Sequence, residues 1–206
     1  MPASAGRDRH RAAVRRRGRA GREAGAVARS CRRSPVMTGI LQTTPMRAAH
    51  TNTRPRFTMP AGAAPRGWHL QFYTPGTVVR DILPFLADLE DPFVIDHMGY
   101  MLEAEGLTPA DFGRLLGVLA QGNCWIKLSG PYRIAKSRPL SYVEPVGRAL
   151  VSTRPDRLIW GSDWPHLPDG QRDTGELLNL LADWAPDEAD RRAILAASPG
   201  RLFFAD

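Results

Sequence analysis

Four short apolar segments recur in the last two thirds of the chain, each rich in β-branched or aromatic residues and each ending at Gly, Pro or a polar cluster. These are the features of β-strands. Three of the four are close to continuously apolar, which is typical of strands buried on both faces of a parallel sheet. The pattern predicts strands over residues 68–73, 93–96, 124–128 and 157–161.

Between these segments, apolar residues recur every three to four positions, which indicates amphipathic helices. Pro84 should bend or shorten the first of them, while Thr108 and Pro109 mark the start of the second and Gly122 its end. Alternating strands and helices predict an α/β fold with right-handed βαβ units and a parallel sheet. The predicted helices cover residues 77–89, 108–122, 142–151 and 174–184.

The first 66 residues have a different composition. They contain fifteen Arg, no Lys and two acidic residues, without helical or alternating apolar periodicity. Too little apolar surface is present to offset the entropy of ordering, so we expect a disordered basic leader over 1–66 and a folded domain over 67–206. A nucleic-acid-binding arm and a transit peptide are alternatives for this leader. We favour a start codon assigned too far upstream, with Met37, Met46 or Met59 nearer the true start.

Charge, hydropathy and cysteine content exclude several classes of protein. The net charge is +7, but residues 67–206 carry 13 basic and 19 acidic side chains, and an acidic domain repels phosphate backbones. No run approaches eighteen apolar residues, so no membrane-spanning helix is expected. Two cysteines, Cys31 and Cys124, cannot build a disulfide framework, which predicts a cytoplasmic protein. We therefore expect neither a nucleic-acid partner nor a membrane.

Polar side chains follow all four predicted strands. Because the carboxyl ends of parallel strands meet at one edge of a sheet, we expect these side chains to lie together. A histidine and an aspartate so placed can share a divalent metal, or polarise a carbonyl and activate water without one. An arginine and a tyrosine beside them suit a substrate carboxylate. The residues are Tyr73, Thr74, Asp96, His97, Ser129, Tyr132, Arg133, Ser162, Asp163 and His166.

Three motifs around these residues resemble a known family. They are Val-Ile-Asp-His-Met-Gly (94–99), Trp-Ile-Lys-Leu-Ser-Gly-Pro-Tyr-Arg (125–133) and Trp-Gly-Ser-Asp-Trp-Pro-His (160–166). In order and spacing they are similar to the amidohydrolase-2 family of TIM-barrel hydrolases, and within it to lactonases that act on 2-pyrone-4,6-dicarboxylate and related lactones. The resemblance covers about residues 67–206.

The resemblance implies roles for five residues. Asp163 matches the aspartate that activates the attacking water or binds metal, and His97 matches the histidine that polarises the scissile carbonyl or ligates metal. Tyr73, Arg133 and His166 match residues that line the substrate pocket. The implied reaction opens a lactone of a small carboxylated substrate, without a cofactor in the lactonase branch. The alternative is one divalent metal such as Zn²⁺, held by His97 and Asp163.

The sequence also departs from this family. Tyr100 stands where several relatives carry Arg, which bears on specificity for dicarboxylates, and the opening His-x-His pair of the family is missing. Eight βα units need about 250 residues, so the residues after 66 predict a partial (β/α)8 barrel of the last four to five units. The alternative to an active hydrolase is an inactive half-barrel, a pseudoenzyme or interaction fragment. Its two open sheet edges would favour self-association.

Overall fold

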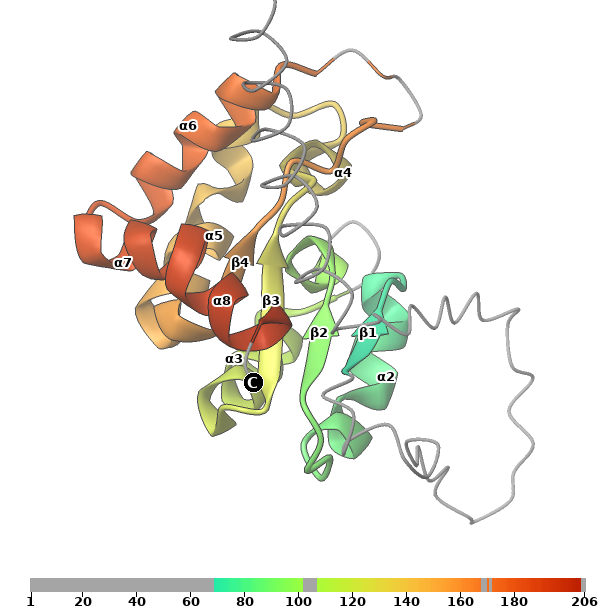
Figure 1. The fold of residues 1–206 in the computed structure, drawn as a ribbon. Coiled ribbons are helices and arrows are strands. Elements are labelled where there is room, and N and C mark those ends of the chain that lie inside the picture. Colours follow the sequence, from blue (N-terminus) through green and yellow to red (C-terminus); the bar gives the residue numbers. More distant parts are fainter. Residues whose placement is uncertain (1–68, 102–106, 168–169, 171, 205–206) are drawn as a thin grey trace, which may run out of the picture. The chain divides into compact units, whose positions relative to one another are not determined.

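Four parallel strands form the sheet in a computed structural model that describes residues 69–101, 107–167, 170 and 172–204 (Figure 1). Each strand pairs with the next one along the chain, which confirms the predicted parallel α/β architecture. The predicted disordered leader lies outside the described residues. The strands are β1 (Leu70–Phe72), β2 (Phe93–Ile95), β3 (Cys124–Leu128) and β4 (Leu158–Trp160).

The strand bounds differ from the predicted ones only at the ends. Strand β3 has the predicted bounds, whereas the other three are shorter. The predicted end residues still join the backbone ladder, because Asp96 N donates to Phe72 O at 3.0 Å and Gly161 N donates to Leu128 O at 3.3 Å. The sheet therefore continues to the positions where polar side chains begin.

The helices follow the predicted order with two corrections. Helix α2 ends at Leu86 rather than 89, two residues after Pro84, whose ring and missing N–H disfavour further turns. The helix predicted over 142–151 is divided, because Pro145 favours the first turn of a new helix. The observed elements are α2 (Gly76–Leu86), α3 (Pro109–Gln121), the 3-10 turn η5 (Leu140–Val143), α5 (Glu144–Thr153) and α6 (Thr174–Trp184).

Helix α3 shows how local sequence sets its bounds. Thr108 accepts a hydrogen bond from Asp111 N, and the Asp111 carboxylate accepts one from Thr108 N at 2.8 Å, which completes a capping box. At the other end Gly122 adopts a left-handed conformation with φ 100°, which favours glycine. Both ends of this helix lie where the sequence predicts them.

Several short elements were not predicted. The 3-10 turn η3 follows β2 directly, and α4 follows β3, so both lie where the candidate site was expected. After α6 the chain continues through a π-helical turn into α8. No helix of the described residues is both long and apolar enough to span a membrane. The added elements are η3 (His97–Tyr100), α4 (Pro131–Ala135), η6 (Pro155–Arg157), α7 (Glu188–Arg192), η7 (Ala193–Ala197) and α8 (Ser198–Phe203).

The main hydrophobic core lies between one face of the sheet and helices α2, α3, α5 and α6. Successive residues of a strand point to opposite faces, so Phe93 and Ile95 enter this core while Val94 does not. Burying one such side chain completely stabilises the fold by about 1.5–3 kcal/mol. The sheet and each of these four helices contribute side chains that are at most 2% exposed, among them Leu83, Leu119, Ile126, Leu150 and Leu181.

The opposite face of the sheet carries a smaller cluster of Val94, Trp125 and Ile159. Leu202 and Phe203 of α8 pack against it, and Figure 1 shows α8 on the viewer's side of β3 and β4. Helix α8 thus covers the part of this face next to β4.

Candidate active site

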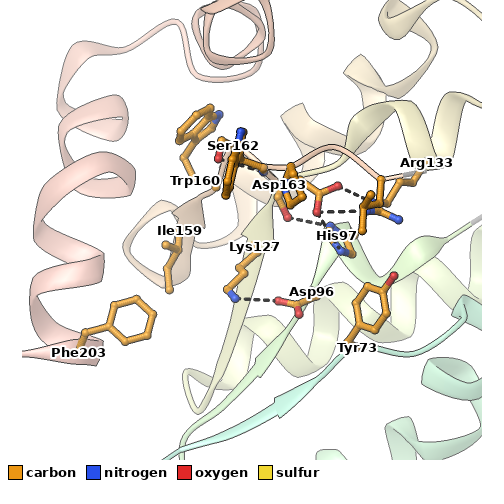
Figure 2. A pocket seen from close by; sticks show the side chains of 15 residues that line it. Tyr73, Asp96, His97, Lys127, Arg133, Ile159, Trp160, Ser162, Asp163 and Phe203 are labelled. Carbon is orange, nitrogen blue, oxygen red and sulfur yellow. Dashed lines mark hydrogen bonds and ion pairs between the residues drawn. The ribbon is translucent and has the colours of Figure 1, made fainter. Parts of the chain in front are cut away.

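A pocket of about 770 Å³ opens at the carboxyl ends of the strands (Figure 2). Tyr73 follows β1, His97 follows β2, Arg133 lies on α4 after β3, and Asp163 follows β4; all four line this pocket. Side chains that are up to 90 residues apart in sequence therefore meet at one edge of the sheet, as the strand-end pattern predicts.

The backbone is strained where it presents the two central side chains. His97 has φ 50° and Asp163 has φ 60°, both in the left-handed region that residues with a Cβ rarely adopt. Met98, Gly99 and Tyr100 continue the positive φ run after His97. Such conformations cost of order 1–3 kcal/mol each and cluster at functional sites. The strained backbone at both His97 and Asp163 indicates that this edge of the sheet is a functional site.

Asp163 is held by three hydrogen bonds. Its Oδ2 accepts from Tyr132 Oη and from Arg133 Nε, both at 2.5 Å, and its Oδ1 accepts from Arg133 Nη2 at 3.3 Å. His97 Nε2 lies 3.8 Å from Oδ1. Burial alone would raise the pKa of Asp163, but the hydrogen bonds from Arg133 and Tyr132 outweigh it and hold that pKa below its usual value. Asp163 is thus ionised and accepts three hydrogen bonds.

The imidazole of His97 is buried and positioned. Ser129 Oγ lies 3.0 Å from Nδ1, and when that hydroxyl donates, Nε2 carries the proton and faces Asp163. The rings of Tyr73 and Tyr100 contact the imidazole edge-on, with centroids 5.2 and 5.1 Å away. Burial lowers the pKa of His97 despite the nearby Asp163 carboxylate. A neutral imidazole with its N–H toward the pocket can donate a hydrogen bond to a carbonyl oxygen.

Gly130 allows the side chains of His97, Arg133 and Asp163 to approach one another. A Cβ at this position would lie 2.8 Å from His97 Nδ1, 2.9 Å from Asp163 Oδ2 and 3.0 Å from Arg133 Cδ. Its φ of 56° also favours glycine. The motif Ser-Gly-Pro-Tyr-Arg therefore supplies a backbone position without a side chain at the point where all three groups converge.

Asp96 also lines the pocket and belongs to a second polar group. Gln71 Nε2 donates to Asp96 Oδ2 at 2.8 Å, and Lys127 Nζ pairs with Asp96 Oδ1 at 3.1 Å (Figure 2). Asp96 is therefore held by Gln71 and Lys127. Lys127 lines the pocket but was not among the predicted site residues. The signal was present, because a lysine within an otherwise apolar strand needs a polar partner on its own face.

Tyr132, one of the polar residues expected at the strand ends but given no role, donates to Asp163, and His166 lies against it. Burial, followed by the hydrogen bond to Asp163, raises the pKa of Tyr132 to about 12, so the phenol remains a donor. His166 has φ 59° and is buried; its ring contacts Tyr132, and Nε2 lies 3.3 Å from Thr174 Oγ1. The structure places His166 behind Tyr132 and not among the residues that line the pocket.

The described residues do not fit a metal ion. They contain no group of three or more His, Cys, Asp and Glu side chains that could hold one. His97 and Asp163 offer two donors, but the Arg133 guanidinium already occupies the carboxylate and would repel a cation there.

The fold and the site together define a protein built from barrel-type βα units with a His, Asp and Arg cluster at the strand ends. The family model described as amidohydrolase matches residues 2–205, and the chain belongs to this family.

Curated relatives are lactone-acting proteins about twice as long. The chain is 39% identical over 142 residues to a 4-sulfomuconolactone hydrolase of Hydrogenophaga intermedia, covering 66% of this chain and 46% of that protein. It is 30% identical over 150 residues to a 2-pyrone-4,6-dicarboxylate hydrolase of Comamonas testosteroni, covering 67% and 49%. A D-galactarolactone isomerase of Agrobacterium fabrum is 31% identical over 145 residues, covering 66% and 48%. The chain thus spans about half the length of these relatives.

Solved structures show the same relationship. A protein of Agrobacterium tumefaciens superposes with a TM-score of 0.61 at 30% identity, covering 70% of this chain and 53% of that one. A probable 2-pyrone-4,6-dicarboxylic acid hydrolase of Acinetobacter baumannii, crystallised with citric acid, gives a TM-score of 0.57 at 25% identity, covering 68% and 53%. The predicted partial (β/α)8 barrel is confirmed.

Proposed function

We propose that the chain carries the site of a hydrolase that opens a lactone ring of a small carboxylated substrate. One observation carries this proposal: His97, Arg133 and Asp163 converge on one pocket, two of them from strained backbone. The lactone-acting relatives support the choice of a cyclic ester as substrate.

Each residue has a distinct task in this reaction. Asp163 takes a proton from water, whose oxygen attacks the lactone carbonyl carbon. His97 donates a hydrogen bond from Nε2–H to the carbonyl oxygen and stabilises the negative charge that develops on that oxygen. The ring C–O bond then breaks, and the leaving oxygen takes up a proton. Arg133 and the half-exposed Tyr73 hold a carboxylate of the substrate at the rim.

The test is an assay of the full chain on 2-pyrone-4,6-dicarboxylate beside Asp163→Asn. Removing a general base should lower turnover by about 10²- to 10⁴-fold. Asp81→Asn is the matched control, because Asp81 is exposed and pairs with Arg80 on α2. Equal turnover in all three proteins would remove Asp163 from the mechanism.

The second candidate is a catalytically silent barrel segment. It is favoured by the span of the chain, about half the length of the lactone-acting relatives. Folded protein without turnover in both the wild type and Asp163→Asn would support this candidate. Circular dichroism of the same samples checks that the protein is folded.

Self-association through the sheet edges is a further expectation of either candidate. In the part of the chain that the structure describes, β1 and β4 each pair with a strand on one side only. Unpaired edges are templates for pairing with another chain. Sedimentation of the full chain over a range of concentrations tests this, since a constant monomer mass would contradict it.

A further inference from the structure

Asp163 has almost no acceptor position left for water. An ionised carboxylate offers about four lone-pair positions. Tyr132 and Arg133 together take three of them, and His97 Nε2 lies near the fourth, 3.8 Å from Oδ1 (Figure 2). A water molecule that loses its proton to Asp163 needs one of these positions. Only the position on Oδ1 beside His97 is left for water, so the release of a donor would widen the access of water to Asp163.

Tyr132, which donates to Asp163, and His97, which faces it, are both held in place. Tyr132 is 6% exposed, and its ring lies between His166, with centroids 6.3 Å apart, and the Arg172 guanidinium, 5.0 Å from the ring centroid. His97 is 6% exposed and is held through Nδ1 by Ser129 and through its ring by two tyrosines. Both rings are therefore held in place by their neighbours.

Arg133 differs from both. Its side chain is long and lines the open pocket, and only two of its five N–H groups are used on Asp163. Its partner is a single carboxylate bound through Nε and Nη2, a geometry that any other carboxylate can reproduce. An anionic group that enters the pocket therefore competes directly with Asp163 for the guanidinium.

We propose that Arg133 limits the access of water to Asp163 until a carboxylate of the substrate binds the guanidinium in place of Asp163. A lactone that carries a carboxylate thereby frees the base that activates water for its own hydrolysis. This rests on the proposed lactone hydrolysis and adds a reason for selectivity. No covalent bond changes in this step: two N–H···O bonds move from Asp163 to the substrate. A lactone without a carboxylate leaves Arg133 on Asp163 and is turned over slowly even when it binds.

The experiment uses a lactone and its activator as separate molecules. The full chain is assayed on 2-pyrone, which lacks carboxylates, with and without saturating acetate. We expect acetate to raise 2-pyrone turnover by at least about fivefold, the factor that corresponds to about 1 kcal/mol. Arg133→Gln should turn over 2-pyrone faster than the wild type without acetate, and acetate should add nothing.

The same variant should act in the opposite direction on 2-pyrone-4,6-dicarboxylate, because the anchor for the substrate is lost. Arg148→Gln is the matched control, since Arg148 pairs with Glu144 on α5, away from the pocket. If Arg133→Gln lowers turnover of both substrates, or if acetate does not raise turnover of 2-pyrone, Arg133 is only an anchor and the proposal is wrong. The lactonase proposal survives that result.

A second measurement does not depend on turnover. Crystals of the full chain are soaked with pyridine-2,4-dicarboxylate, an inert planar dianion. A guanidinium on the ligand and an Asp163 oxygen facing solvent would support the release step even if no lactone were hydrolysed. Arg133 still on Asp163, with the ligand bound or with the pocket empty, would overturn it.

Discussion

The outer core and the pocket edge of this sheet are built on opposite principles. Between the sheet and α2, α3, α5 and α6, side chains are apolar and buried, and α3 ends in ordinary capping motifs. At the carboxyl ends of the strands, the titratable side chains of His97 and Asp163 are buried or half-buried on strained backbone. Strained backbone persists only where the surrounding structure enforces it. The free energy gained by packing the outer core therefore offsets the cost of the strained backbone at the pocket edge. Changes in the two regions should therefore have separable effects.

The largest effect is expected in the outer core. Leu150 of α5 is fully buried, and Leu150→Ala should lower the free energy of unfolding by about 2–5 kcal/mol, since it removes apolar contacts and leaves a cavity. Urea denaturation measures this. Leu178→Ala on α6 is the control, because Leu178 is 39% exposed and should lose far less. Equal losses would contradict the division between core and surface.

Gly130→Ala should damage the site more than the fold. The added Cβ would press on His97, Asp163 and Arg133, and misplacing reacting groups by about 1 Å can cost 10²-fold in rate. Gly122→Ala is matched for backbone strain, because Gly122 also has positive φ, but a Cβ there meets only Arg154 at 3.4 Å and 3.7 Å and Arg157 at 3.9 Å. Both variants should lose about 1–2 kcal/mol of stability, but only Gly130→Ala should lose turnover. Kinetics like the wild type in Gly130→Ala would show that the cluster adapts.

Stability should fall as the pH is lowered below about 6.5. Burial, and then the charge of Lys127, hold the pKa of His69 below its usual value, so the unfolded chain binds a proton more readily than the folded one. The stabilisation is complete above pH 6.5 and is lost below it, with a slope of at most about 1.4 kcal/mol per pH unit for this group. Urea midpoints from pH 8 to 5 measure it. His69→Gln should flatten the profile, and an unchanged slope would assign it to other groups.

The smallest effect concerns the cap of α3. Thr108→Ala removes the side chain that accepts from Asp111 N and should cost about 1 kcal/mol. Thr153→Ala is the control, since its hydroxyl donates to Ala149 O within α5 and satisfies no orphan N–H group. Thermal unfolding of both variants separates capping from the loss of any threonine hydroxyl.

Sequence reasoning succeeded where one local signal decides the outcome. The bounds of α3 follow from Thr108, Pro109 and Gly122, and the continuous apolar run of β3 fixes that strand. The convergence of His97 and Asp163 follows from parallel topology, because both come directly after strands. These features need no knowledge of contacts distant in sequence.

The remaining features depend on contacts that a linear pattern does not contain. Arg133 and Asp163 are 30 residues apart, and nothing in either motif shows that they bind each other rather than a substrate. The positive φ of His166 turns its side chain behind Tyr132, although its position in the motif suggests the pocket. Leu202 and Phe203 lack a period that assigns them to a face of the sheet.

Trp164 gives the molecule a built-in optical reporter. Its indole lines the pocket next to Asp163 and is 78% exposed, while the other tryptophans of the described residues, Trp125, Trp160 and Trp184, are buried or half-buried. A molecule that settles in the pocket removes water from that ring, which shifts its emission to shorter wavelength and shields it from iodide quenching. Occupancy can therefore be followed by fluorescence on unlabelled protein, with Trp164→Phe as the blank.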